Sequence, residues 1–242
     1  MELIFIGTKG NIEESSKKHK MHTSLLINYH KTRLLVDCGL SWLNKFEDYN
    51  PSHILLTHAH PDHVFGLREG APCKVWATKI TWDLISNFPI EPALKNIIKI
   101  ERKAKIGSIF VEAFALLHSV NAPAVGYKIK CGKIYFFYAP DVAWIENRKK
   151  ALKGVKFYIG DGATLKRSMI RKNKQTGEIF GHASVFQQLG WCVRKNVPEM
   201  IITHCGSQIV KREKKAQKII EQWSKDKGIK TYIATDGYKI IL

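Results

Sequence analysis

One short segment carries three histidines and an aspartate within six positions, directly after an apolar stretch. The segment reads His58-Ala59-His60-Pro61-Asp62-His63 and follows residues 53–56. Neutral imidazole and carboxylate groups are preferred zinc ligands, and their close spacing allows one short loop to present them together. The apolar stretch predicts a buried strand, and Asp62 and His63 are expected to open a helix after it. The segment therefore predicts a metal site at the end of a strand.

Length and composition bound the rest of the interpretation. The chain has 242 residues, of which 45% are hydrophobic. We find no repeat and no linker rich in Pro, Gly or Ser, which predicts one domain over residues 1–242. No apolar run approaches 18 residues, so no membrane span is expected. Residues 3–6 are expected to form the first strand and not a signal peptide, because no basic region precedes them. The five scattered cysteines indicate reduced thiols and a cytoplasmic location.

The formal net charge of +18 is unusual and has two open explanations. The segment between residues 145 and 175 contains ten Lys and Arg residues but only two acidic residues, Glu146 and Asp161. Such a patch attracts polyanions, which favours a phosphate-bearing substrate. The alternative is a proteome rich in Lys and Ile, as in hyperthermophiles, in which the charges are simply solvated.

Apolar periodicity predicts two strand-rich blocks with helices between and after them. The expected strands cover residues 3–6, 24–28, 33–36, 53–56, 74–77, 109–116, 125–130, 133–138, 155–159, 200–202, 232–234 and 239–242. The expected helices, besides the one opened by Asp62, cover residues 142–152, 184–195 and 208–224. Two sheets packed face to face, with helices outside each, would bury this pattern in one core.

Four further polar residues lie where buried strands are expected to stop. They are His118, Asp141, Asp161 and His204. Alone, each is more simply an ordinary polar residue at the end of a strand. Ligands at strand ends on one rim converge, however, and the strands hold them rigidly. Together with the histidine-rich segment, the four residues predict one site assembled from distant parts of the chain.

Over nearly its whole length the chain resembles the metallo-β-lactamase superfamily. The matching pieces, in the family's order, are Leu35-Val36-Asp37-Cys38-Gly39, the segment His58–His63, His118, Asp141 and His204. The resemblance implies an α+β fold, a four-layer αββα sandwich, with two divalent metal ions. Zn is expected, and Mn or Fe would suit the same ligands. Asp37 would orient the motif loop by hydrogen bonds. By that resemblance, one metal would be held by His58, His60 and His118. The other would be held by Asp62, His63 and His204, and Asp141 would bind both metals.

Finer features are similar to the ribonuclease Z branch, whose members cut the 3′ trailer from precursor tRNA. Residues 1–8 and 22–26 resemble its opening, residues 160–164 its HEAT motif, and residues 181–184 its GHST motif. In that family the histidine corresponding to His182 donates a proton to the leaving oxygen. An acidic residue of the HEAT segment supports it, and the resemblance offers Asp161 for that role.

The chain also departs from that branch. Ribonuclease Z inserts a long arm that grips tRNA, and here His118 to Asp141 leaves only 23 residues, filled by two expected strands and a turn. The HEAT-like segment carries Asp161-Gly162 where His-Glu is usual. Short enzymes of the same branch that open cyclic ribose phosphates also lack the arm. A phosphodiester substrate is therefore a safer expectation than tRNA.

The expected function is a di-metal hydrolase in which a hydroxide bridging the metals cleaves a phosphodiester. It would act as a nuclease on RNA or as a phosphodiesterase on a cyclic nucleotide or ribose phosphate, with Asp62, His182 and Asp161 as catalytic residues. One alternative is hydrolysis of a carboxylic ester, lactone or thioester at the same site. Another is a nucleic-acid-binding protein with a structural metal site. The resemblance leaves a homodimer open.

Overall fold

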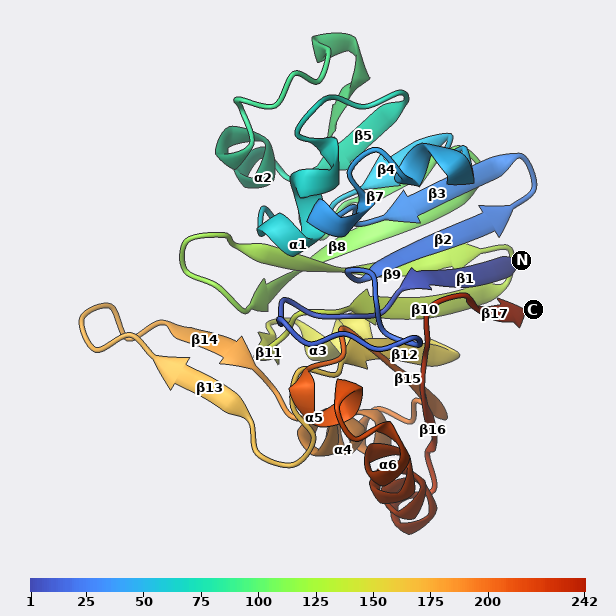
Figure 1. The fold of residues 1–242 in the computed structure, drawn as a ribbon, viewed down its shortest axis with the longest axis vertical. Coiled ribbons are helices and arrows are strands. Elements are labelled where there is room, and N and C mark those ends of the chain that lie inside the picture. Colours follow the sequence, from blue (N-terminus) through green and yellow to red (C-terminus); the bar gives the residue numbers. More distant parts are fainter.

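Two β-sheets packed face to face form the centre of the molecule, with helices on the outer side of each (Figure 1). The computed structural model describes residues 1–242. The first sheet has the strand order β17-β1-β2-β3-β4-β5-β6, and the second has the order β11-β8-β9-β10-β12-β15-β16, with β7 paired to β8. Strands β13 and β14 pair only with each other. The arrangement is the predicted α+β sandwich.

The elements have the following bounds. The strands are β1 (Glu2–Gly7), β2 (Ser24–Tyr29), β3 (Thr32–Val36), β4 (His53–Leu55), β5 (Lys74–Ala77), β6 (Lys95–Ile97), β7 (Lys103–Ile106), β8 (Ile109–Leu117), β9 (Ala124–Cys131), β10 (Ile134–Ala139), β11 (Trp144–Ile145), β12 (Phe157–Asp161), β13 (Met169–Lys172), β14 (Ile179–His182), β15 (Glu199–Thr203), β16 (Lys230–Ile233) and β17 (Tyr238–Ile241). The α-helices are α1 (Pro61–Val64), α2 (Lys79–Leu84), α3 (Arg148–Ala151), α4 (Val185–Arg194), α5 (Ser207–Val210) and α6 (Glu213–Lys227). The 3₁₀ turns are η1 (Leu40–Trp42), η2 (Phe46–Tyr49), η3 (Phe65–Leu67) and η4 (Pro92–Leu94).

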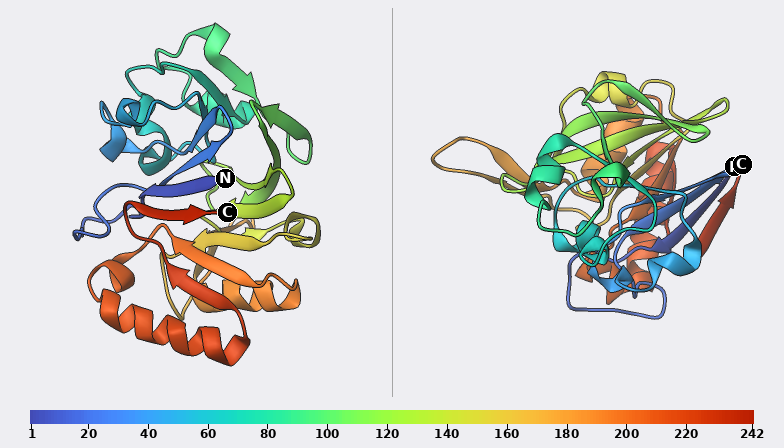
Figure 2. Two further views of the ribbon diagram at one scale, coloured as in Figure 1. Left: turned by 90° about the vertical axis from the view of Figure 1, so that its right-hand side faces the viewer. Right: turned by 90° about the horizontal axis from the view of Figure 1, so that it is seen from above.

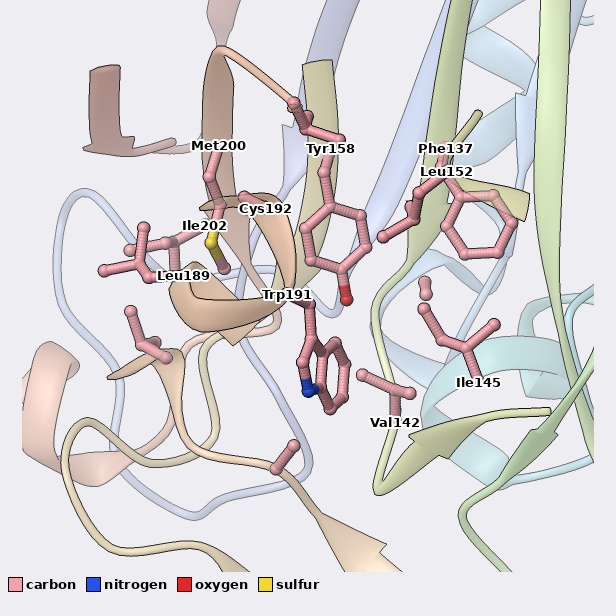
Figure 3. Packing of buried hydrophobic residues seen from close by; sticks show 14 of the residues in the cluster. Phe137, Val142, Ile145, Leu152, Tyr158, Leu189, Trp191, Cys192, Met200 and Ile202 are labelled. Carbon is pink, nitrogen blue, oxygen red and sulfur yellow. The ribbon is translucent and has the colours of Figure 1, made fainter. Parts of the chain in front are cut away.

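Three apolar layers separate the four layers of secondary structure. The middle layer joins the inner faces of the sheets and includes Phe5 and Tyr127. A second layer packs the short helices of the N-terminal half, through residues such as Trp42, onto the first sheet. The third packs α4 and α6 onto the second sheet, with Trp191 and Tyr158 among its buried side chains (Figure 3). Each sheet is therefore covered on both faces.

The alternation of side chains along a strand assigns each residue to one of these layers. On β8, Val111 and Ala113 belong to the layer between the sheets, whereas Phe114 and Leu116 belong to the layer under the helices. Because both faces are buried, the strand is apolar almost throughout its length. Such strands are rigid supports for the residues at their ends.

The expected helix over residues 142–152 is wrong. Trp144 and Ile145 instead form β11, which pairs with Leu117 and Leu116 at the edge of the second sheet. Aromatic and β-branched residues favour this position, because it buries one face against the sheet. Only α3 is helical, and the Asn147 side chain caps it by accepting from the backbone N–H of Lys150 at 3.4 Å.

The expected helix over residues 208–224 is divided into two. Arg212 lies outside the helical region, with φ −138° and ψ 44°, so the chain turns between α5 and α6. The α6 helix then extends to Lys227 and ends at Gly228 in the left-handed conformation with φ 63°, which glycine adopts without a steric penalty. The helix expected from Asp62 is the short α1, and the α4 helix begins and ends within one residue of its expected bounds.

Several elements were not expected from the sequence: α2, β6, β7 and the hairpin of β13 and β14. The hairpin projects away from the sandwich, as the right-hand view of Figure 2 and the orange arrows in Figure 1 show. Between His118 and Asp141 the chain is occupied by β9 and β10, as expected. None of the helices is both long and apolar enough to cross a membrane. The division of the chain into one domain stays a prediction.

Candidate metal and catalytic site

The predicted site residues meet at one rim of the sandwich, where the strands that precede them end. The histidine-rich segment follows β4, His118 follows β8, Asp141 follows β10 and His204 follows β15, while Asp161 is the last residue of β12. Strands β10, β12 and β15 run parallel to one another, so their carboxyl ends lie side by side. The structure therefore brings together all seven expected metal ligands, together with Asp161 and His182.

Three histidines form the first group of the site. The Nε2 atom of His58 lies 3.0 Å from Nδ1 of His60, which lies 3.3 Å from Nε2 of His118. The other ring nitrogen of His118, Nδ1, lies 3.1 Å from the Gly181 carbonyl oxygen and must donate to it. The Nε2 lone pair of His118 then points at the other two rings. Such crowding of ring nitrogens suits a cation between them.

The second group combines two carboxylates with two histidines. Oδ2 of Asp62 lies 3.3 Å from Nε2 of His63 and 3.2 Å from Nε2 of His204. Asp141 lies between the two groups, with Oδ2 at 2.6 Å from His63 and 3.6 Å from His58. Its other oxygen lies 3.2 Å from Nδ1 of His204. Asp141 is thus the residue shared by both groups.

Asp37 holds the histidine-rich segment in place. Its carboxylate is fully buried and accepts from the Thr57 backbone N–H at 2.8 Å and from Nδ1 of His63 at 2.9 Å. The second bond fixes the His63 ring with its Nε2 atom facing Asp141. Asp37 itself adopts a left-handed conformation with φ 63°, which aspartate tolerates better than most residues.

His182 stands beside the second group and is paired with Asp161. Its Nδ1 lies 2.7 Å from Oδ2 of Asp161, which also accepts from the Val142 backbone N–H at 3.0 Å. The His182 side chain keeps 22% of its surface exposed, while Asp161 is fully buried. The His182 ring thus lines the pocket, with its Nδ1 atom bonded to Asp161.

Burial and charge divide the histidines into two kinds. Burial lowers the pKa of His58 well below its ordinary value and that of His60 to about 4, and it also lowers the pKa of His118. For His204, burial alone would lower the pKa, but Asp141, Asp161 and Asp62 outweigh it and raise the pKa to about 10. Asp161 likewise outweighs burial and raises the pKa of His182. The first group is therefore neutral imidazole with free lone pairs at neutral pH.

The donor set fits metal ions. Three buried atoms, Nε2 of His63, Oδ1 of Asp141 and Nδ1 of His204, form no hydrogen bond despite the short distances given above. Unpaired buried polar atoms are costly and rare, and an ion is one of the things that satisfies them. Imidazole nitrogen and carboxylate oxygen are also the ligand types that zinc and related divalent ions take. The residues of both groups can thus hold divalent metal.

A pocket of about 500 Å³ opens over the site. Its lining includes the site residues His60, Asp62, His118, Asp141, His182 and His204, and also residues of other segments, among them Gly10, Asn11 and Gln208. Its polar lining and direct access to both metal-binding groups suit a charged substrate. The pocket walls come from loops distant in sequence, and no motif identified them.

Sequence reasoning also missed Gln188 of α4. Its Nε2 donates to the backbone carbonyls of Asp161 at 2.8 Å and Ala183 at 3.0 Å, and its Oε1 accepts from the Asp161 backbone N–H at 2.9 Å. Gln188 thus ties α4 to Asp161 and to Ala183, the residue that follows His182. In the sequence, Gln188 stands out only as a polar residue on the apolar side of an expected helix. Nothing in the sequence connects this residue to Asp161.

Gly39 is required for close contact between the β3 loop and the metal-binding loop. A Cβ atom there would lie 1.9 Å from the Asp62 carbonyl oxygen. Because that oxygen belongs to the backbone, we expect Gly39→Ala to displace the loop and destabilise the protein by about 1–3 kcal/mol. Urea unfolding measures the change. Gly190→Ala is the control, because its Cβ would come no closer than 3.4 Å to Arg194 and alanine favours the helix. If both variants lowered the free energy of unfolding equally, the role of Gly39 in this close contact would be contradicted.

Comparisons with known proteins agree with this geometry. A family model described as a β-lactamase superfamily domain matches residues 32–205, well over half of the chain. The exodeoxyribonuclease WalJ of Streptococcus pneumoniae is 27% identical over 142 residues, which cover 52% of each chain. A ribonuclease Z of Methanococcus aeolicus is 30% identical over 162 residues, which cover 62% of this chain and 48% of that one. The chain thus spans about half the length of the curated relatives it matches.

Solved structures share the fold. The crystal structure of the metallo-β-lactamase fold protein YhfI from Bacillus subtilis matches with a TM-score of 0.74, at 15% identity, over 99% of this chain and 98% of that one. A likeness at this identity concerns the fold alone. It agrees with the four layers described above.

Proposed function

Because this chain belongs to the β-lactamase superfamily, we propose that it is a metal-dependent phosphodiesterase that cleaves nucleic acid or a smaller phosphodiester. The observation that carries the proposal is the His182–Asp161 pair beside the metal-binding groups. Cleavage of a phosphodiester between sugars expels an alkoxide, a poor leaving group that requires a proton from a positioned acid. The names of the matched relatives, WalJ and ribonuclease Z, support the same chemistry.

The proposal assigns two metal ions to the two groups. His58, His60 and His118 would hold one ion, and Asp62, His63 and His204 the other, with Asp141 shared. Zn is the metal we propose, and Mn or Fe would accept the same ligands. When bound, two divalent ions would activate a water molecule and offset the negative charge of the phosphate. We further propose that the enzyme acts in the cytoplasm, where its five unpaired cysteines would stay reduced.

The remaining steps fall to side chains of the chain itself. His182 would give a proton to the departing oxygen, because its Nδ1 is held by Asp161 and its ring lines the pocket. Asp161 keeps the ring in one orientation and favours its protonated form. Asp62 also lines the pocket, and its carboxylate is placed to accept a proton from the attacking water. Asp37 keeps His63 in its metal-binding tautomer.

One experiment tests the reaction class. The metal-free protein is loaded with Zn or Mn and assayed with bis(p-nitrophenyl) phosphate, a short RNA, a cyclic nucleotide, a thioester and a lactone. We expect turnover of phosphodiesters only, abolished by a chelator and restored by the metal. Hydrolysis of the thioester or lactone without any phosphodiester would replace the proposal with the carboxylic ester alternative. Salt-dependent RNA binding without hydrolysis, at full metal loading, would indicate a binding protein.

A further inference from the structure

The projecting hairpin of β13 and β14 is attached directly to the site. His182, the last residue of β14, belongs to the His182–Asp161 pair. The neighbouring Gly181 donates its backbone N–H to the His118 carbonyl at 2.7 Å and accepts from Nδ1 of His118 at 3.1 Å. The base of the hairpin is therefore fixed to a metal-binding residue, while residues 170–172 and 174–179 are exposed. A ligand on the hairpin would lie next to the cleaved bond.

The register of the hairpin sorts its side chains into two faces. Met169 is opposite His182, and Arg171 is opposite Phe180. Residues directly opposite each other in an antiparallel pair share a face, as do alternate residues along a strand. Arg171, Phe180 and Met169 therefore lie on the face that carries His182, which we call the His182 face. Ile170, Lys172 and Ile179 lie on the other face, which leads to a separate apolar pocket.

The His182 face continues the binding site outward. Met169 lines the main pocket together with the metal-binding residues. A second pocket of about 420 Å³ adjoins it, between the hairpin residues Asn173 and Phe180 and the site residues His60 and His118. Since His60, His118 and His182 line both pockets, a ligand can extend from one into the other. The two pockets form a path along the hairpin.

The composition of the hairpin favours a nucleic acid strand on this path. Residues 166–178 contain five basic side chains (Lys166, Arg167, Arg171, Lys172 and Lys174) and one acidic side chain, Glu178. A phosphate backbone is attracted to such a segment, and direct contacts with it fall to the side chains on the His182 face. Phe180 is only partly buried and lines the second pocket, and aromatic rings beside cations are the surfaces on which unpaired bases stack.

We propose that the His182 face binds single-stranded nucleic acid next to the cleaved phosphate, with Phe180 stacking on a base and Arg171 bonding to a neighbouring phosphate. This inference rests on the proposed phosphodiesterase function and adds its substrate class. Neither of these two side chains lines the main pocket, so a small cyclic phosphate or bis(p-nitrophenyl) phosphate bound there is expected to depend little on them. RNA and DNA strands offer the same bases and phosphates to them.

The test compares the two faces of the hairpin in the metal-loaded full chain. Arg171→Ala and Phe180→Ala alter the His182 face, and Lys172→Ala and Ile179→Ala are matched controls on the other face. For each variant we measure kcat/KM for a single-stranded oligonucleotide, as RNA and as DNA, and divide it by kcat/KM for bis(p-nitrophenyl) phosphate. We expect the ratio to fall about tenfold or more in each His182-face variant and to stay within about twofold in the controls.

Salt dependence separates the roles of the two residues. On a plot of log kcat/KM for the oligonucleotide against log salt, Arg171→Ala should make the slope shallower by about 0.7, the contribution of one phosphate contact on a single strand. Phe180→Ala should leave the slope unchanged. If all four variants give the same ratio while the wild type cleaves the small probe, this inference is wrong and the proposed function stands. If the wild type cleaves no phosphodiester, both are wrong.

Discussion

Replacing His182 with alanine is expected to lower kcat for an oligonucleotide by a factor of roughly 10² to 10⁴, the usual contribution of a positioned acid. The departing oxygen of a ribose or deoxyribose is a strong base, so its departure depends on the proton from His182. p-Nitrophenolate is a much weaker base and leaves readily without a proton. The loss on bis(p-nitrophenyl) phosphate should therefore be smaller, and the difference between the two substrates is the signature of an acid.

Metal content and a matched variant complete this test. His182→Ala should retain the metal content of the wild type, measured by elemental analysis, because the expected ligands are other residues. His30→Ala removes an exposed histidine of the turn between β2 and β3 and should leave kcat unchanged. An equal loss on both substrates would show that His182 does not act as the acid. Loss of metal in His182→Ala would instead make the residue a ligand.

Adding zinc to the metal-free protein is expected to raise its melting temperature by roughly 8–16 °C. A ligand present at a thousand times its dissociation constant stabilises the folded state by about 4 kcal/mol, and 1 kcal/mol shifts the melting temperature of a chain this size by about 2–4 °C. The physical reason is the set of unpaired buried atoms on His63, Asp141 and His204. A cation would satisfy all three and would offset the buried carboxylates. Thermal unfolding followed by circular dichroism measures the shift.

Asp141→Asn tests whether this stabilisation arises at the described site. Asp141 contacts members of both groups, so losing its charge should remove most of the zinc-dependent rise and the bound metal. Asp83→Asn is the control, because Asp83 is exposed and pairs only with Lys79 on α2; its response to zinc should match the wild type. A full rise in Asp141→Asn would place the metal elsewhere on the chain.

The strands were predictable because their apolar runs are short and bounded by polar or turn residues. The strand of residues 74–77 is β5 to the residue, and each of the others differs by at most two residues at either end. The errors lie in segments whose apolar residues are compatible with more than one secondary structure or with more than one element. Trp144 and Ile145 have the spacing of a helical face but are used by the edge of a sheet. The residues of α5 and α6 read as one amphipathic helix, although two separate helices pack there.

The hairpin escaped prediction for a different reason. Residues 169–182 are mostly polar or charged and have little buried surface, so hydrophobic periodicity carries no information about them. The sequence comparison with ribonuclease Z correctly indicated that no arm fits between His118 and Asp141. It did not indicate that another projection follows Asp161. The hairpin also sets the number of residues between the HEAT-like segment and His182.

The sequence by itself determined the chemistry of the site: the identity of its imidazole and carboxylate groups, and their position at the ends of apolar strands. These properties are local, because a ligand's chemistry belongs to the residue and the strand that precedes it. Only the tertiary structure decided which nitrogen faces the centre and which face of the hairpin adjoins the pocket. Those properties depend on distances of a few ångströms between segments up to 142 residues apart, such as Asp62 and His204, and only packing of the two sheets sets them.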